Sequence, residues 1–272
     1  MIVSKSHISI ALQASMDASF VLMDFYQNGF SSKDKEDGTP VTEADNASSL
    51  VIHELLTTTN IPIIGEEITN LPYVERKNWE LNWCVDPLDG TKEFIKKNNE
   101  FAINIALIYQ GTPIFGCITS PTERKIIYGG KGLGVFIIEF NEFKEVTSTF
   151  KISKQLTIQK PLTLIASRSF HTVEINHFIT QLEVLFGSVT LHQKGSALKF
   201  FDLALGKADL YARFAPTMEW DIAAGQAILE ELGGEIRAVN SGSKLVYNKE
   251  NLLNPHFIAK TFAFNQQQVS SL

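Results

Sequence analysis

The chain has 272 residues and a formal net charge of −6, with 44% hydrophobic and 20% charged residues. These values are ordinary for a soluble globular protein, and the negative charge excludes the basic surface with which proteins bind nucleic-acid polymers. At this length the chain forms one large domain or two modest ones. A substrate of nucleotide size would need a local cluster of lysine and arginine.

The first sixty residues are predicted to be mostly helical. One helix covers residues 4–28, and a second helix covers residues 43–59 after a polar loop at 31–39. A short strand at 61–64 follows the second helix. This region therefore supplies helices, with one strand that leads into the next part of the chain.

The apolar N-terminal stretch is interrupted by Gln13, Asp17 and Asp24. Such a pattern favours an amphipathic core helix over a transmembrane span or a signal peptide. Cys84 and Cys117 lie in strand-like apolar runs and are expected to be buried, reduced thiols. We therefore expect a cytoplasmic protein. Peripheral attachment to the cytoplasmic face of the inner membrane stays open, and so does a homodimer.

The middle of the chain is rich in strands, and its end alternates strands with helices. A mostly antiparallel sheet is expected from strands at 81–85, 102–109, 114–119, 125–128 and 134–138. Beyond residue 154, strands are expected at 162–166, 188–191 and 208–211, and helices at 173–185, 196–205 and 221–232. This alternation predicts a layered sheet with helices on its faces. We expect an α+β subdomain over residues 1–150 and an α/β subdomain over residues 151–272.

The run CVDPLDGTKEFI is the most informative part of the chain. Asp86 and Asp89 lie three residues apart at the end of an apolar strand, which Pro87 and Gly90 are expected to end in a turn. Such a turn can direct both carboxylates and the Leu88 carbonyl at one point. Hard divalent cations prefer this all-oxygen ligation. The alternative is a surface turn rich in Asp and Gly.

Other carboxylates stand at strand ends and helix starts. Glu66 and Glu67 follow the strand at 61–64, while Asp45 and Asp221 stand near the starts of helices. Open α/β sheets place their ligand sites at such positions. Taken singly, Asp221 is explained by the helix dipole, and Asp45 and Glu66 by exposure to solvent. The argument for a metal site therefore depends on the whole set.

The motifs GEE at 65–67, WCVDPLDGT at 83–91 and EWDIAAG at 219–225 resemble those of the lithium-sensitive, magnesium-dependent inositol monophosphatase superfamily. Longer strings are similar to its bacterial 3'(2'),5'-bisphosphate nucleotidases, and they cover residues 35–45, 89–95 and 195–200. The resemblance spans most of the chain. It implies an α/β protein of layered α+β type, the αβαβα five-layer sandwich of inositol monophosphatases and fructose bisphosphatases.

The resemblance also implies a cluster of two or three Mg²⁺ ions. One ion would be held by Glu66, Asp86 and the Leu88 carbonyl, and a second by Asp86, Asp89 and Asp221. The residues implied in catalysis are Asp45, Glu66 and Thr91, of which Asp45 and Thr91 would orient or deprotonate the attacking water. The residues implied to contact the substrate around the metals are Glu66, Leu88, Asp89, Gly90, Thr91 and Asp221, with the amides of Gly90 and Thr91 receiving the phosphate.

A bisphosphate nucleotide needs cations for its second phosphate. The candidates, Lys92, Arg168, Lys199 and Arg213, suit phosphate as point charges or bidentate donors, with solvated surface charges as the alternative. Ser196, at the start of the helix expected at 196–205, offers amide donors to an anion. The nucleotidase pattern commonly has His where this chain has Phe170, followed by His171. Either the loop is shifted by one residue, or an aromatic ring replaces the imidazole near the nucleotide, or Phe170 is a core residue.

We therefore expect a Mg²⁺-dependent phosphatase that removes the 3'-phosphate of 3'-phosphoadenosine 5'-phosphate to give AMP, with 3'-phosphoadenosine 5'-phosphosulfate as a second substrate. The alternative within the superfamily is an inositol or sugar monophosphatase. The alternative of another class is a non-catalytic protein that binds Mg²⁺ or nucleotide.

Overall fold

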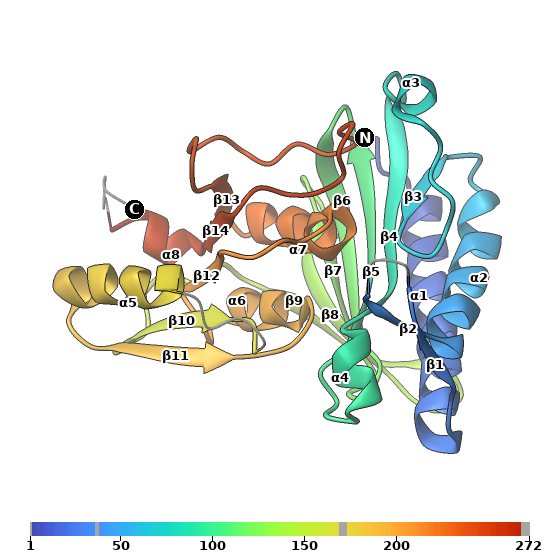
Figure 1. The fold of residues 1–272 in the computed structure, drawn as a ribbon, viewed down its shortest axis with the longest axis horizontal. Coiled ribbons are helices and arrows are strands. Elements are labelled where there is room, and N and C mark those ends of the chain that lie inside the picture. Colours follow the sequence, from blue (N-terminus) through green and yellow to red (C-terminus); the bar gives the residue numbers. More distant parts are fainter. Residues whose placement is uncertain (1, 36–37, 169–172, 268–272) are drawn as a thin grey trace.

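The computed structural model describes residues 2–35, 38–168 and 173–267. Over these residues the elements form five layers, αβαβα, which confirms the expected fold (Figure 1). The first layer contains α1 (Lys5–Asn28) and α2 (Glu43–Thr57), which lie on one face of a seven-stranded sheet. The third layer contains α6 (Leu198–Ala204) and α7 (Glu219–Glu231), between this sheet and a five-stranded one. The fifth layer contains α5 (Val173–Phe186).

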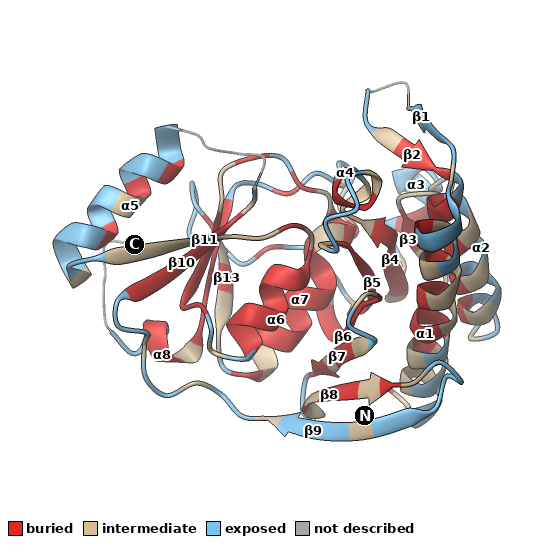
Figure 2. Cartoon of the chain, turned by 90° about the horizontal axis from the view of Figure 1, so that it is seen from below, coloured by how far each residue is buried: buried red, intermediate tan, exposed pale blue. Residues whose placement is uncertain are grey.

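The seven-stranded sheet follows the order of the chain, and all its neighbouring pairs except β3 and β4 are antiparallel. Its strands are β3 (Ile63–Gly65), β4 (Leu81–Asp89), β5 (Ala102–Tyr109), β6 (Thr112–Ser120), β7 (Lys125–Gly130), β8 (Gly134–Phe140) and β9 (Val146–Ile152). Residues 102–108 are fully buried, because helices cover both faces of the sheet (Figure 2). The expected antiparallel sheet is therefore present, and the division expected after residue 150 falls inside β9.

The five-stranded sheet has the order β11, β10, β12, β14, β13. Its strands are β10 (Leu162–Ala166), β11 (Val189–Gln193), β12 (Leu210–Arg213), β13 (Glu235–Ala238) and β14 (Phe257–Lys260). Strands β11, β10 and β12 are parallel, and their carboxyl ends therefore meet at one edge. This edge faces the pocket described below.

Helix α7 packs against both sheets and carries Asp221 in its first turn. Its close approach to β6 requires glycine, since a Cβ atom on Gly116 would lie 2.1 Å from the carbonyl oxygen of Ala224. A Cβ atom on Gly225 would similarly lie 2.2 Å from the ring of Phe200 on α6. These two contacts fix the distance of α7 from the sheet and from α6, and thereby the position of Asp221.

Short elements complete the chain. They are β1 (Ser32–Asp34) and β2 (Pro40–Thr42), which form a hairpin, α3 (Tyr73–Arg76), α4 (Thr91–Ile95) and α8 (Phe262–Asn265). The sequence analysis did not predict the hairpin, which lies in the expected polar loop, nor β9, β13 and β14. These strands are short or, like β9, largely exposed at an edge, so they lack the apolar alternation that identifies a strand.

Helix α1 begins with a capping box in which Ser4 accepts a hydrogen bond from the His7 amide. By length and composition alone, it is the one helix among the described residues that could span a membrane. Its buried side packs against α2, β5 and β6, as expected for a core helix. Cys84 and Cys117 are both buried and free, in agreement with the expectation of reduced thiols.

Candidate active site

The two aspartates of the central motif lie on a distorted part of β4. The pairing of β4 with β5 shifts register between Asp86 and Asp89, which is a bulge rather than the expected end of the strand. The Leu88 amide donates to Asp86 Oδ1 at 3.0 Å, and the Ser48 hydroxyl donates to the Pro87 carbonyl at 2.7 Å. Proline is tolerated here because the bulge needs no amide donor from it. The bulge thus keeps the strand while it reorients the carboxylates.

The chain turns into α4 directly after the bulge. Gly90 has a left-handed backbone with φ +94°, a conformation that glycine adopts without strain. A Cβ atom at this position would lie 3.1 Å from the Glu100 carbonyl oxygen and 3.3 Å from the Cβ of Ser196. Gly90 therefore allows the turn after Asp89 to pack against the segments that carry Glu100 and Ser196.

Three carboxylates converge beside this turn. Oxygen atoms of Asp86, Asp89 and Asp221 all lie within 4.8 Å of one another. Asp86 and Asp89 come from β4, whereas Asp221 comes from α7, 132 residues beyond Asp89. An all-carboxylate donor set fits hard divalent cations such as Mg²⁺ or Ca²⁺ better than soft metals. These three carboxylates therefore fit the Mg²⁺ ions that the sequence motifs imply.

Burial and mutual repulsion make this cluster unfavourable without a cation. Burial, followed by the charges of Asp89 and Glu66, raises the pKa of Asp221 to about 8. Burial and neighbouring carboxylates raise the pKa of Asp86 well above its ordinary value. Burial also raises the pKa of Asp89, although the charge of Lys199 opposes the shift. A bound divalent cation would supply the missing positive charge and return these groups to their ionised form.

Asp45 and Thr91 form a hydrogen-bonded pair next to the cluster. The Thr91 hydroxyl donates to Asp45 Oδ1 at 2.9 Å, and the Leu88 carbonyl lies 3.3 Å from the same hydroxyl. The other oxygen of Asp45 accepts from the amide and hydroxyl of Thr42, at 2.7 and 2.6 Å, in the capping box of α2. Burial raises the pKa of Asp45, with the Thr42 hydrogen bonds opposing the shift.

Glu66 lies at the end of β3 and is paired with Lys35. The Lys35 ammonium lies 2.8 Å from Glu66 and 2.5 Å from Glu67. Burial alone would lower the pKa of Lys35, but its hydrogen bonds to both glutamates outweigh this effect and raise it. The sequence analysis assigned no role to Lys35, although this residue begins the string at 35–45 that resembles the nucleotidases.

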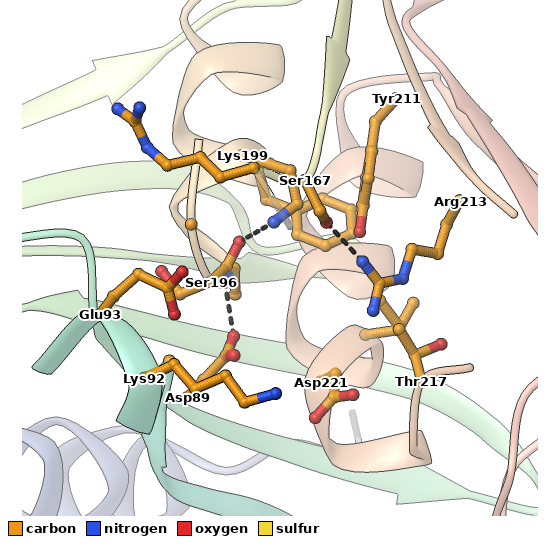
Figure 3. A pocket seen from close by; sticks show the side chains of 16 residues that line it. Asp89, Lys92, Glu93, Ser167, Ser196, Lys199, Tyr211, Arg213, Thr217 and Asp221 are labelled. Carbon is orange, nitrogen blue, oxygen red and sulfur yellow. Dashed lines mark hydrogen bonds between the residues drawn. The ribbon is translucent and has the colours of Figure 1, made fainter. Parts of the chain in front are cut away.

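An open cavity of about 150 Å³ joins two chemically different ends (Figure 3). At the carboxylate end, the lining includes Asp89 and Asp221. At the cation end, Lys199 and Arg213 line the wall that the five-stranded sheet and α6 provide. The other lining residues include Gly90, Lys92, Glu93, Ser167, Arg168, Ser196, Tyr211 and Thr217. The cavity therefore contains every residue expected at a second phosphate.

The expectation that a helix begins at Ser196 is wrong. Helix α6 begins at Leu198 rather than at Ser196, and Ser196 has a left-handed backbone with φ +51°. The Gly195 amide donates to Glu100 at 2.8 Å, and the Ala197 amide donates to Asp89 at 2.5 Å. These amides therefore bind carboxylates of the protein rather than remain available to an anionic ligand.

Lys199 nevertheless reaches the pocket. Its ammonium donates to the carbonyl groups of Lys194, at 3.3 Å, and of Ser196. Burial lowers the pKa of Lys199 to about 8, against the attraction of Asp89. A second anion near this ammonium would favour its charged form.

The two arginines differ in position. Arg213 lies at the end of β12, where its guanidinium donates to the Ser167 hydroxyl at 2.5 Å and to the Pro216 carbonyl at 2.9 Å. Arg168 instead forms a bidentate ion pair with Glu100, at 2.5 Å for each bond. This pairing was not expected from the sequence, because the two residues lie 68 positions apart. The expected contribution of Phe170 lies outside the described residues.

The chain is similar in sequence to a known protein family. The model of the inositol monophosphatase family matches residues 4–270. The 3'(2'),5'-bisphosphate nucleotidase CysQ of Salmonella typhimurium is 40% identical over 229 residues, which are 82% of this chain and 86% of that protein. CysQ of Haemophilus influenzae is 34% identical over 87% of this chain and 86% of that protein.

Solved structures agree with the sequence comparison. The crystal structure of CysQ from Bacteroides thetaiotaomicron has a TM-score of 0.84 at 34% identity, over 96% of this chain and 99% of that one. The suhB protein of Bartonella henselae has a TM-score of 0.73 at 22% identity, over 96% of this chain and 95% of that one. The second likeness shows the shared fold alone.

Proposed function

Because this chain belongs to the inositol monophosphatase family, we propose that its pocket hydrolyses the 3'-phosphate of 3'-phosphoadenosine 5'-phosphate to give AMP and phosphate. The observation that carries this proposal is the pocket with carboxylates at one end and Lys199 and Arg213 at the other. Such a pocket suits a substrate with two phosphates. Its likeness to the CysQ nucleotidases supports the same substrate class. The phosphosulfate analogue is a second substrate in this proposal.

The metal part of the proposal assigns two or three Mg²⁺ ions to the acidic cluster. Glu66, Asp86 and the Leu88 carbonyl would hold one ion, and Asp86, Asp89 and Asp221 another. When bound, Mg²⁺ ions lower the pKa of a bound water and neutralise the charge on the transferring phosphoryl group. Glu66 would offer Oε2 to the metal, because its Oε1 already accepts from the Lys35 ammonium.

Thr91 and Asp45 would remove the proton from the attacking water. The Thr91 hydroxyl donates its hydrogen to Asp45, so its oxygen lone pairs can accept a hydrogen bond from water. As the water attacks phosphorus, its proton passes to Thr91 and the Thr91 proton passes to Asp45. The raised pKa of Asp45 suits this role, because it makes the carboxylate a stronger base. The amides of Gly90 and Thr91 would receive the oxygens of the same phosphate.

The second phosphate would bind at the cation end. Lys199 and Arg213 line that end, and Lys92 and Ser196 lie nearer Asp89 (Figure 3). Arg213 is fixed by Ser167 and Pro216, so little conformational entropy remains to be lost on binding. Arg168 would act mainly through the wall of the pocket, because Glu100 holds two of its guanidinium N–H donors in a bidentate ion pair.

An inositol or sugar monophosphatase of the same family is the alternative. It would need no second anion site, so a buried lysine and an arginine opposite the carboxylates would have no ligand. A non-catalytic protein that binds Mg²⁺ or nucleotide would not need the Asp45–Thr91 pair. The observed residues therefore favour the nucleotidase.

Phosphate release by the purified protein tests the proposal. Release from 3'-phosphoadenosine 5'-phosphate should require Mg²⁺, stop in EDTA, and exceed release from inositol 1-phosphate. Low millimolar Li⁺ should inhibit it. Release from inositol 1-phosphate alone would contradict the assignment of the cation end, and tight nucleotide binding without turnover would favour the non-catalytic alternative.

The proposal includes a cytoplasmic location, in agreement with two buried, free thiols, and clearance of a by-product of sulfate assimilation. Peripheral attachment to the membrane and a homodimer are not needed for the pocket, because a single chain supplies both of its ends.

A further inference from the structure

Glu100 connects the two halves of the molecule at the pocket. It lies just before β5 of the seven-stranded sheet, while its partners Arg168 and Gly195 follow β10 and β11 of the five-stranded sheet. One oxygen, Oε2, accepts from Arg168 Nε and from the Gly195 amide, and Oε1 accepts from Arg168 Nη2. A single carboxylate therefore holds two segments of the opposite half.

The first of these segments carries Lys199. The Gly195 amide is fixed by Glu100, and the Ala197 amide by Asp89, so the intervening Ser196 is held in its left-handed conformation. Such a conformation costs a non-glycine residue free energy and persists only where surrounding contacts impose it. The carbonyl of Ser196 in turn accepts from the Lys199 ammonium. The place of this cation thus depends on the turn that Glu100 secures.

The second segment supports Arg213. Arg168, bound to Glu100, directly follows Ser167, whose hydroxyl accepts from the Arg213 guanidinium at 2.5 Å. The ion pair with Glu100 therefore restrains the residue that orients Arg213. Lys199 and Arg213 are both supported through Glu100, which does not itself line the pocket.

We propose that Glu100 is a positioning residue that fixes Lys199 and Arg213 relative to the carboxylate cluster, and so sets the preference for a substrate with two phosphates. This inference depends on the proposed function, because the second phosphate is what the two cations would bind. A competing role would be that Glu100 withholds Arg168 from the substrate. The two roles predict opposite changes in KM when the carboxylate is neutralised.

The test compares the wild type with Glu100→Gln on two substrates, 3'-phosphoadenosine 5'-phosphate and 3'-AMP, which lacks the second phosphate. Glutamine removes the negative charge and replaces Oε1 with an NH₂ group, which cannot accept from Arg168 Nη2, so the ion pair that holds Arg168 is lost. We expect KM for the bisphosphate to rise about tenfold, the size of one lost charge-assisted hydrogen bond. The kcat should change less than KM, and the preference for the bisphosphate over 3'-AMP should fall by a similar factor.

The matched control is Glu142→Gln, which removes an exposed carboxylate paired with Arg124 at 3.1 Å and away from the pocket lining. Arg168→Gln should reproduce part of the loss, because the Gly195 contact with Glu100 remains. A fall in KM for the bisphosphate in Glu100→Gln would overturn the proposal in favour of the competing role. An equal loss on both substrates with a lowered Tm would reduce Glu100 to a purely structural residue.

The experiment distinguishes failure of the proposed function from failure of the role of Glu100. Wild-type protein that releases no phosphate from the bisphosphate would overturn the proposed function and this inference together. Normal release by the wild type, with an unchanged preference in Glu100→Gln, would overturn only the role of Glu100.

Discussion

At the carboxylate end of the pocket, three aspartates are each fixed by a backbone amide close in the chain, whereas the cation end is fixed by residues far apart. Asp86 accepts from the Leu88 amide, Asp45 from Thr42 and Asp221 from Met218, over two or three positions. At the cation end, the Arg213–Ser167 contact spans 46 positions and the Gly195–Glu100 contact spans 95. The first end is set by local backbone, whereas the second depends also on contacts between neighbouring strands of the five-stranded sheet and between the two sheets.

This difference has a mechanistic consequence. Because the carboxylates are oriented locally, each substitution there should act on the metals or the attacking water without moving the other ligands. Substitutions at the cation end should instead act on the affinity for the second phosphate. Asp89 is the exception, because it accepts from Ala197, 108 positions away, and thus belongs to both ends.

Asp89→Asn should have the largest effect. It keeps the size and one acceptor oxygen for Ala197, but it removes the negative charge from the carboxylate cluster. We expect kcat to fall by at least about 10³-fold, because the metal clamp on the reacting phosphate is lost, while far-UV circular dichroism stays unchanged. A near wild-type rate would remove Asp89 from the metal site.

Thr91→Val should have the next largest effect, and it tests the carboxylate end alone. Valine preserves the shape of threonine but removes the hydroxyl between Asp45 and the water. We expect kcat to fall about 10²-fold with little change in KM, as general-base catalysis is lost. Thr91→Ser, which keeps the hydroxyl, is the matched control. A large rise in KM for Thr91→Val would show that Thr91 binds substrate rather than moves a proton.

Lys199→Met tests the cation end with a smaller effect. Methionine fills a similar volume without the charge. We expect KM for the bisphosphate to rise about 30-fold, the cost of one hydrogen bond to a charged group, with a smaller change for 3'-AMP. Steady-state kinetics on both substrates measures the difference. Equal changes in KM for the two substrates would place Lys199 at the carboxylate end and would contradict the difference between the two ends.

The same contrast explains what the sequence could predict. The run around Asp86 and Asp89 carries its geometry within a few residues, so the convergence of these side chains was predictable, although the bulge in place of a turn was not. The helix start at Leu198 and the partners of Gly195 and Arg168 depend on Glu100 and Asp89 in another sheet. No local sequence pattern predicts such contacts. They override the local preference for a helix that begins at Ser196.

Stability without metal should depend on pH in a direction set by the carboxylate end. The pKa of Asp221 is about 8 in the folded chain, above the ordinary value of 3.8, so the folded state binds more protons than the unfolded state between these values. Stability in EDTA should therefore fall as pH rises from 6 to 8, by roughly 5 °C in Tm. Lys199, with a pKa lowered from 10.5 to about 8, begins to oppose this trend near pH 7 and offsets it near pH 8. Saturating Mg²⁺ or Asp221→Asn should flatten the dependence, and a Tm in EDTA that rises over this range would contradict the raised pKa of Asp221.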